Sequence, residues 1–289
     1  MLGAGGAELD AHAEPWGIMR LPASGFVGAF DGVAAAWRAT HPHAQAIACG
    51  MVGSAQGWVR AAYVPCPAGV DALAERLAAV PERGLHVVPG LTSAADPPDV
   101  MRGEETQIVG ALALRPALSA ASCVVLPGTH SKWARVVESN VVDFATFMTG
   151  ELFAVLRDHS LLGRPARDAA TTVDTATADD AFARGVRLAF DAAHGVAPLL
   201  FSARTAVLAE RLDPAASLRY LSGLLVGDEL RVGLARYGAP DALVGDPALC
   251  ERYATALRTV DRPSVPVLDG AAPAGLWRVA ECAGLVTDA

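Results

Sequence analysis

A short turn in the middle of the chain carries residue types that could bind a phosphate group. The turn contains Gly128, Thr129 and His130, follows an apolar run, and is followed closely by Lys132. Glycine lets backbone amides approach an anion, threonine adds a hydroxyl donor, and lysine supplies a point charge. Lys132 is also the only lysine among the 23 basic residues. A phosphate-binding turn and a plain hairpin turn both fit this pattern.

Two adjacent carboxylates, Glu104 and Glu105, follow Arg102 and a glycine at the start of a helical pattern. One of them could act as a general base or organise a metal, beside an arginine that binds an anion. Adjacent helical residues point about 100° apart, so both carboxylates rarely serve one site. A favourable interaction with the helix dipole is the alternative.

A third candidate is the turn Gly245-Asp246, which separates an apolar run from Pro247. Such a turn can hold a nucleotide at a helix N-terminus, but helix initiation by proline explains it equally well. The chain has no GxxxxGK[ST] and no GxGxxG motif, and its histidines lack metal-ligand spacing. The metal ligands therefore remain unassigned.

Helical and strand-like patterns alternate along the chain, which indicates an α/β architecture. Residues 122–137 read as a hairpin, so the sheet is expected to be mixed, and residues 114–121 suit a domain boundary. Helices are expected over residues 26–37, 70–80, 150–158, 178–193, 215–237, 247–258 and 273–283, and strands over 46–49, 85–88, 122–126, 242–244 and 265–268.

Composition excludes several classes of protein. With 289 residues, 52% of them hydrophobic, the chain can bury a sizeable core and is not disordered throughout. No apolar run is long enough to span a membrane, and the N-terminus does not resemble a secretory signal. The net charge of −8 with scattered arginines gives no nucleic-acid footprint.

Seven blocks, in this order along the chain, together resemble the 2-dehydro-3-deoxygalactonokinase family of sugar-acid kinases. The family lies in the superfamily of actin, hexokinase and heat-shock ATPases. The blocks are GMVGSAQGW (50–58), YVPCPA (63–68), VMRGEETQIVGA (100–111), LPGTHSKW (126–133), FMTGELFAVLRDHSLLG (147–163), YLSGLLVGDEL (220–230) and LVGDPALCERYATAL (243–257).

The resemblance implies two ribonuclease-H-like lobes with mixed sheets flanked by helices and an active site in the cleft between them. It divides the chain into a sugar-acid lobe, 1–118, and a nucleotide-binding lobe, 119–289. It also implies phosphorylation of the 6-hydroxyl of 2-dehydro-3-deoxy-D-galactonate with ATP and Mg²⁺ as cofactors.

The resemblance also implies roles for individual residues. In the nucleotide lobe, LPGTHSKW resembles a phosphate loop and LVGDPALCERY resembles the adenosine-side turn. In the sugar-acid lobe, Glu104 is expected to be the base, with Glu105 second, and Arg102, ahead of Lys132, is expected to bind the sugar carboxylate. The residues expected to bind ATP are Gly128, Thr129, His130, Lys132, Gly245 and Asp246, and those expected to contact the sugar acid are Ser54, Gln56, Trp58 and Arg102.

The N-terminus departs from the family pattern. The family opens with a strand and Asp-Trp-Gly-(Ser/Thr), its first phosphate loop, whereas the sequence around Pro15-Trp16-Gly17 lacks the aspartate. The first lobe is therefore expected to be incomplete and to lack its opening strand. An impaired relic or a ligand-binding protein of the same fold is one alternative.

Residue types do not separate related sugars, so a kinase for another 2-keto-3-deoxy or aldonic acid is a second alternative. The expected partners are a small-molecule sugar acid and ATP, with a homodimer left open and no nucleic acid or membrane. The expected location is the cytoplasm.

Overall fold

The computed structural model describes residues 1–17, 20–169 and 172–286. These form a mixed α/β protein, as the sequence predicted. The chain divides into two compact units, each interrupted in sequence. Unit 1 comprises Met1–Ser122, Arg135–Phe144 and Gly270–Ala289, and unit 2 comprises Cys123–Ala134 and Ala145–Asp269. Relative to the expected lobes 1–118 and 119–289, residues 119–122, 135–144 and 270–289 group with unit 1 in this division.

The described part of unit 1 contains two small mixed sheets. In the first, β4 is central, with β1 parallel and β3 antiparallel to it. In the second, β5 is central, with β2 parallel and β6 antiparallel. The strands are β1 (Ala46–Ala48), β2 (Tyr63–Pro65), β3 (Ala78–Val80), β4 (Leu85–Val87), β5 (Gly90–Ser93) and β6 (Asp99–Met101).

The C-terminal segment joins unit 1 because one of its helices packs against α3 at very close range. A Cβ atom on Gly110 of α3 would lie 1.7 Å from the Ala271 carbonyl oxygen, and one on Gly275 would lie 1.9 Å from the Thr106 carbonyl oxygen. Only glycine permits such an approach. The helices of unit 1 are α1 (Gly25–Thr40), α2 (Val70–Ala74), α3 (Glu104–Leu114) and α10 (Ala271–Cys282).

Residues 135–144 join unit 1 through backbone hydrogen bonds. Ala68 and Val141 exchange two such bonds, with N–O distances of 3.1 and 2.9 Å. The amides of Glu138 and Ser139 donate to the carbonyls of Ala120 and Ser119. The tip of the hairpin formed by β8 (Ser131–Val137) and β9 (Asn140–Phe147) therefore belongs to unit 1.

Unit 2 contains most of a five-stranded sheet in the order β11-β10-β7-β8-β9, of which the start of β7, the end of β8 and the start of β9 are counted in unit 1. Strand β10 runs parallel to both β7 and β11, with Leu243 opposite Val125. The short turn between β7 and β8 makes them a hairpin, so the sheet is mixed as predicted. The strands are β7 (Ala121–Leu126), β8 (Ser131–Val137), β9 (Asn140–Phe147), β10 (Ala242–Val244) and β11 (Val267–Leu268).

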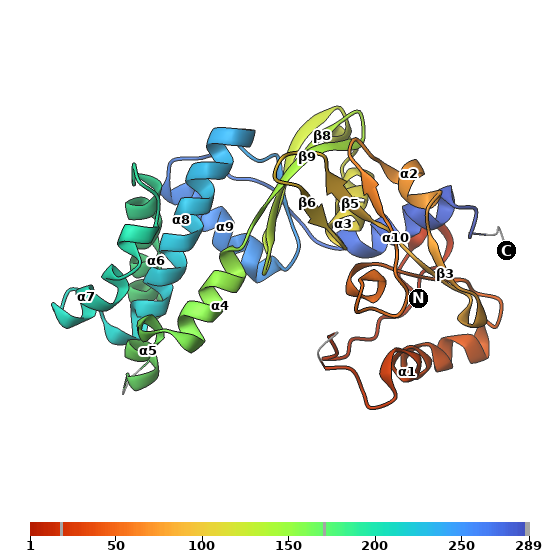
Figure 1. Cartoon of the computed structure of the whole chain (residues 1–289), viewed down its shortest axis with the longest axis horizontal. Helices are drawn as coiled ribbons and strands as arrows, with labels where there is room; N and C mark the ends of the chain where they lie inside the picture. Colours follow the sequence, from red (N-terminus) through yellow and green to blue (C-terminus); the bar gives the residue numbers. More distant parts are fainter. Residues whose placement is uncertain (18–19, 170–171, 287–289) are drawn as a thin grey trace. The chain divides into compact units, whose positions relative to one another are not determined.

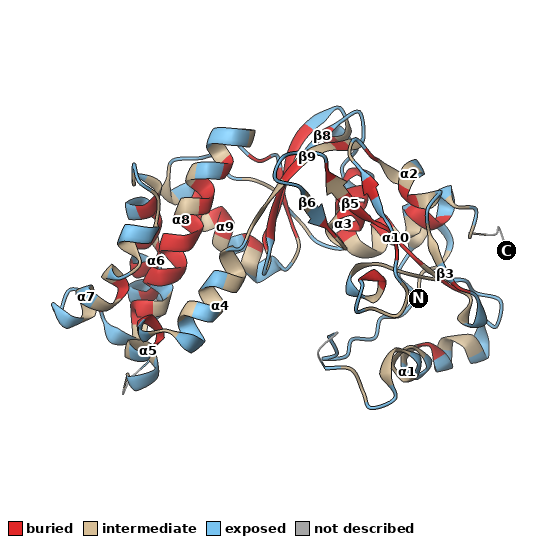
Figure 2. Cartoon of the chain, in the orientation of Figure 1, coloured by how far each residue is buried: buried red, intermediate tan, exposed pale blue. Residues whose placement is uncertain are grey.

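The helices of unit 2 pack around α8, which lies against α6 (Figure 1). Figure 2 shows that α8 is buried along most of its length, and Tyr220, Leu221 and Leu224 are almost fully covered. Four helices predicted for this region are confirmed as α4, α6, α8 and α9. The helices are α4 (Thr149–His159), α5 (Arg164–Asp168), α6 (Thr175–Phe190), α7 (Ser202–Leu208), α8 (Ser217–Tyr237) and α9 (Pro247–Thr259).

The segment 70–80 differs from the single helix that its apolar spacing predicted. Helix α2 ends at Ala74, and residues 78–80 form β3, where Val80 pairs with Leu85. The tertiary pairing with β4 overrides the local helical pattern. None of the helices in the described ranges combines the length and apolar character needed to cross a bilayer.

Candidate active site

The two glycine turns that were expected to bind the nucleotide are neighbours in unit 2. Strands β7 and β10 are adjacent and parallel, so the chain leaves both of them at the same edge of the sheet. Pro127 follows β7 and Gly245 follows β10, and a Cβ on Gly245 would lie 3.6 Å from the Pro127 carbonyl oxygen. Ligands of open α/β sheets bind outside the carboxyl ends of such strands. The fold therefore brings together two motifs that lie more than a hundred residues apart.

The start of α4 packs directly on the turn that carries Gly128 and Thr129. A Cβ on Gly150 would lie 2.5 Å from the Gly128 carbonyl oxygen and 2.7 Å from the Thr129 Cα. The Glu151 amide donates to the Thr129 carbonyl at 3.0 Å. Glycine at position 150 thus lets the helix N-terminus approach the turn closely.

His130 and Lys132 both contribute to the geometry of this turn. His130 Nε2 lies 2.5 Å from Glu151 Oε2, in a half-exposed pair at the start of α4. Lys132 is buried and its Nζ donates to the His130 carbonyl at 3.1 Å. The ammonium of the only lysine is thus held within the turn.

Asp246 starts α9. Its carboxylate accepts a hydrogen bond from the Leu249 amide at 2.8 Å, and Pro247 occupies the first helical turn. This is the N-cap arrangement, and it agrees with the helix-initiation alternative for this residue. Asp246 therefore fixes the direction of the turn that contains Gly245.

In unit 1, the turn at 50–53 packs against the segment that enters α3. A Cβ on Gly53 would lie 3.0 Å from Arg102 Nη1, and one on Gly103 would lie 3.3 Å from the Gly50 Cα. Gly103 has a φ of 109°, which L-residues with side chains rarely adopt. Two of the motifs expected to meet around a sugar acid are therefore in contact.

Arg102 is partly buried, and only some of the nitrogen atoms of its guanidinium donate hydrogen bonds. Its Nη2 donates to the Ala61 carbonyl at 2.9 Å, and its guanidinium lies 4.3 Å from the centre of the Tyr63 ring. Its Nε and Nη1 atoms are buried and have no hydrogen-bond partner among the described residues. Ser54 Oγ, in the adjacent loop, is buried and unpartnered in the same sense.

The other two residues expected to contact the sugar acid differ in their surroundings. Gln56 is exposed in the loop. Trp58 stacks on Phe26 at 6.4 Å and meets Phe30 edge-on at 5.6 Å, and it packs against the apolar cluster of β1 and β4. Its ring therefore packs in the core of unit 1.

Glu104 and Glu105 cap the start of α3 in different environments. Glu104 is partly exposed, and its Oε2 accepts from the Arg102 amide at 3.0 Å. Glu105 is 1% exposed, accepts from the Gly103 amide at 2.6 Å, and accepts from the Thr106 hydroxyl at 3.0 Å. Burial raises the pKa of Glu105 from its ordinary value of 4.5 to about 7. The two carboxylates thus do not share one site.

The buried carboxyl of Glu105 predicts a pH-dependent stability. Between pH 4.5 and about 7 the folded protein keeps a proton that the unfolded chain releases. Stability therefore falls as the pH rises through this window, by about 3 kcal/mol in total. Glu105→Gln removes the ionisation, so we expect its melting temperature to fall less than that of the wild type between pH 5 and pH 8. Thermal unfolding at both pH values measures this effect.

Glu75→Gln is the matched control because Glu75 is an exposed carboxylate of the same unit. It is expected to follow the wild type at both pH values. An unchanged pH profile for Glu105→Gln would contradict the assignment of a raised pKa to this group.

Glu229 of α8 is a buried carboxylate of unit 2 that the motif analysis did not single out. It is 2% exposed and accepts hydrogen bonds from Ser131, Trp133, Thr149 and Tyr253. The signal in the sequence was an acidic residue inside a strongly apolar helical block, YLSGLLVGDEL. Its partners could not be identified because three of them lie 80 to 98 residues away.

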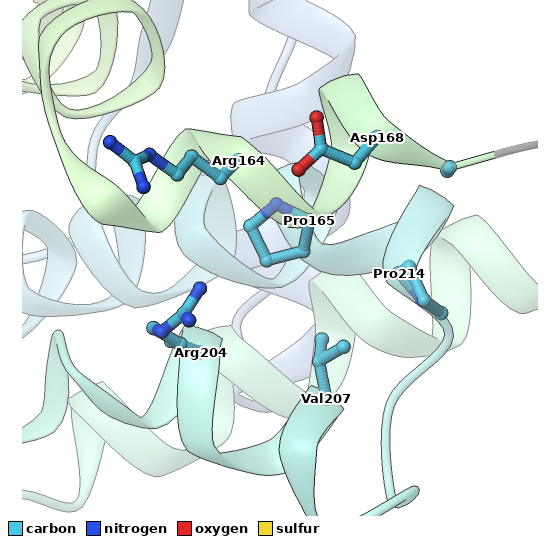
Figure 3. A pocket seen from close by; sticks show the side chains of 7 residues that line it. Arg164, Pro165, Asp168, Arg204, Val207 and Pro214 are labelled. Carbon is cyan, nitrogen blue, oxygen red and sulfur yellow. The ribbon is translucent and has the colours of Figure 1, made fainter.

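Each unit contains a pocket formed by described residues. One of about 430 Å³ is lined by α5 and α7 of unit 2, where Arg164 and Arg204 lie on one side of Pro165 and Asp168 on the other (Figure 3). One of about 1160 Å³ lies in unit 1 beside α1 and β1, and Trp58 lines it. Apart from Trp58, no residue of the expected site lines either pocket.

Comparison with known proteins identifies the family to which the chain belongs. The family model for 2-keto-3-deoxy-galactonokinase matches residues 1–279. A probable 2-dehydro-3-deoxygalactonokinase of Rhizobium meliloti (strain 1021) is 38% identical over 264 residues, covering 90% of this chain and 84% of the relative. The 2-dehydro-3-deoxygalactonokinase of Escherichia coli (strain K12) is 33% identical over 256 residues, covering 87% and 82%.

A solved structure agrees with both curated relatives. The crystal structure of a candidate 2-dehydro-3-deoxygalactonokinase from Sinorhizobium meliloti superposes with a TM-score of 0.86 at 35% identity. It covers 97% of this chain and 93% of its own. Since the family model and the curated relatives match nearly the whole chain, the protein belongs to the 2-keto-3-deoxy-galactonokinase family.

Proposed function

We propose that the protein is a kinase that transfers the γ-phosphoryl group of ATP to the 6-hydroxyl of 2-dehydro-3-deoxy-D-galactonate. The observation that carries the proposal is the family match over residues 1–279, which includes every block that holds a candidate site residue. Two features support it. Unit 1 carries an arginine that can bind the carboxylate of the acceptor, and unit 2 carries glycine turns whose backbone amides can bind the phosphates of the nucleotide.

In this proposal, unit 2 holds the nucleotide. The backbone at Gly128 and Thr129 and the ammonium of Lys132 face the phosphates, where His130 adds a further donor. The turn at Gly245, capped by Asp246, takes the adenosine side. Phosphoryl transfer depends on positioning and on stabilisation of charge, which preorganised backbone donors provide.

Unit 1 holds the acceptor in this proposal. The guanidinium of Arg102 binds the sugar carboxylate, and Ser54 and Gln56 bind its hydroxyl groups. A guanidinium suits a carboxylate because its N–H groups form a planar fork.

Glu104 is the proposed general base because its carboxylate is partly exposed, whereas that of Glu105 is sequestered. It accepts the proton of the 6-hydroxyl as the new O–P bond forms in line with the bond that breaks, and ADP leaves.

Magnesium enters this proposal only with the nucleotide. No group of three His, Cys, Asp or Glu side chains in the described ranges is arranged to hold a metal ion. Mg²⁺ commonly keeps several waters and takes its remaining ligands from substrate phosphates. The residues described here therefore provide no protein cage for it, and none of the steps above depends on one.

The proposed activity is tested by measuring ADP release with a panel of sugar acids. We expect turnover with 2-dehydro-3-deoxy-D-galactonate and little or none with glycerol, plain hexoses or saturated aldonates. Equal turnover of hexoses would contradict the substrate, and the absence of ATP consumption with every 2-dehydro-3-deoxy acid would contradict the kinase activity.

Gly128→Ala is expected to weaken ATP binding without weakening the fold. An added Cβ would have no neighbour closer than 4.0 Å, so the folded protein accommodates it. If phosphate oxygens approach the backbone there, the methyl group occupies their place. We expect KM for ATP to rise about tenfold, the loss associated with one charge-assisted hydrogen bond, while the melting temperature is unchanged.

The control is Gly150→Ala, whose Cβ would meet the backbone of the same turn at 2.5 Å. That variant is expected to lose both stability and ATP binding. An unchanged KM for ATP in Gly128→Ala would argue against a phosphate beside this glycine.

A further inference from the structure

The buried carboxylate of Glu229 accepts four hydrogen bonds from side chains of the proposed nucleotide half. Its Oε1 accepts from Ser131 Oγ at 2.7 Å and from Trp133 Nε1 at 2.9 Å. Its Oε2 accepts from Tyr253 OH at 2.6 Å and from Thr149 Oγ1. An ionised carboxylate has about four acceptor sites, so this arrangement uses all of them.

The four donors come from the elements that carry the two glycine turns. Ser131 and Trp133 belong to β8, which begins where the turn containing Gly128 ends. Thr149 is the first residue of α4, the helix whose start packs on that turn. Tyr253 lies in α9, less than two helical turns beyond its first residue, Pro247. One side chain therefore joins both edges of the proposed nucleotide site.

Stability alone does not account for a carboxylate at this position. Among the described residues, no lysine, arginine or histidine forms an ion pair with Glu229. Desolvation raises its pKa, and the four hydrogen bonds oppose that rise. An unpaired buried charge is costly, and well-packed apolar residues commonly stabilise a core more. The carboxylate instead fixes the positions of β8, α4 and α9 relative to one another.

We infer that Glu229 is a positioning residue for ATP: it holds the turn at Gly128–Lys132 and the turn at Gly245 in the register that binds the nucleotide. The inference rests on the proposed role of these turns in binding ATP. It assigns Glu229 no contact with substrate, and it predicts that disturbing this network changes nucleotide binding while leaving recognition of the sugar acid intact.

Two substitutions test the inference while sparing the fold. In Glu229→Gln, the amide oxygen can accept from Trp133 and Ser131, because the indole can only donate. The amide NH₂ then faces the hydroxyls of Thr149 and Tyr253, whose own protons lose the acceptor that Glu229 provides, so this side of the network must shift. Tyr253→Phe removes one hydrogen bond at the far end of the network.

Tyr220→Phe is the matched control. Tyr220 is also a buried tyrosine of unit 2, 1% exposed against 2% for Tyr253, and its hydroxyl has one partner, Ser202 at 2.9 Å. Ser202 lies in α7, which carries neither turn. A purely structural role for Tyr253 would therefore give the same result for both tyrosine variants.

The measurements are the melting temperature, KM for ATP, KM for the sugar acid, and calorimetric binding of a non-hydrolysable ATP analogue. We expect Glu229→Gln to raise KM for ATP by roughly tenfold to a hundredfold, since misplacement by about 1 Å can have effects of that size. Tyr253→Phe is expected to raise it by about fivefold, consistent with one lost hydrogen bond. KM for the sugar acid should be unchanged in both, and Tyr220→Phe should change neither constant.

Equal effects of Tyr253→Phe and Tyr220→Phe on every quantity would overturn the inference, and so would an unchanged KM for ATP in Glu229→Gln. If the wild type binds the ATP analogue but phosphorylates no sugar acid, the proposed activity fails and calorimetry with the variants still decides the inference. If the wild type does not bind the analogue, the inference fails as well.

Discussion

Glu104→Gln is expected to lower kcat about 10²–10⁴-fold, the range associated with loss of a general base. The amide can still accept the hydrogen bond from the Arg102 amide through its oxygen, so the start of α3 is retained. It cannot take up the proton of the attacking hydroxyl. We therefore expect a large fall in kcat with KM for ATP nearly unchanged, measured by steady-state ADP release.

Glu105→Gln is the internal control for this prediction. Its carboxyl is buried and engaged with Gly103 and Thr106, so its replacement should lower kcat much less. If Glu104→Gln retains full kcat, or if the effects of the two variants are reversed, the assignment of the base to Glu104 is wrong. A reversal would direct attention to Glu105, whose pKa of about 7 suits proton transfer at neutral pH.

The second large effect is expected at Arg102. Arg102→Lys keeps the positive charge but loses the planar fork whose Nε and Nη1 have no partner among the described residues. A hydrogen bond to a charged group contributes about 1.5–3 kcal/mol, so KM for the sugar acid should rise about tenfold to a hundredfold. KM for ATP should not change, because Arg102 belongs to unit 1 and the proposed nucleotide residues belong to unit 2.

Arg60→Lys provides the comparison, since Arg60 is an exposed arginine of the same unit. It is expected to behave as the wild type in both constants. If Arg102→Lys leaves KM for the sugar acid unchanged, Arg102 does not bind the sugar carboxylate, and its role is to pack beside Tyr63 and Ala61.

Local patterns predicted much of the fold. The helical periodicity that became α9 was readable because this helix buries one face, which includes Tyr253, Ala254 and Leu257, within unit 2. The hairpin at 122–137 was readable from two apolar runs around a glycine turn. The segment 70–80 was not, because its last residues pair with β4, and pairing between strands leaves no local mark in the sequence.

The candidate site was predicted in pieces rather than as an assembly. The sequence pointed to Glu104, Arg102 and Lys132 by residue type and by motif. It did not show that the turn at Gly245 lies beside Pro127, because this depends on β10 being inserted next to β7. It also did not distinguish the sequestered Glu105 from the partly exposed Glu104, since burial is decided by tertiary packing.

The contact between α3 and α10 has a consequence for synthesis on the ribosome. Helix α10 follows all of unit 2 in the sequence, yet its Gly275 packs against the Thr106 carbonyl of the helix that Glu104 and Glu105 begin. All of unit 2 has been synthesised before α10 appears. The helix that presents the proposed base must therefore remain partly uncovered until unit 2 and then α10 have been synthesised. A nascent chain stalled after Asp269 would carry every candidate site residue without the helix that packs against α3.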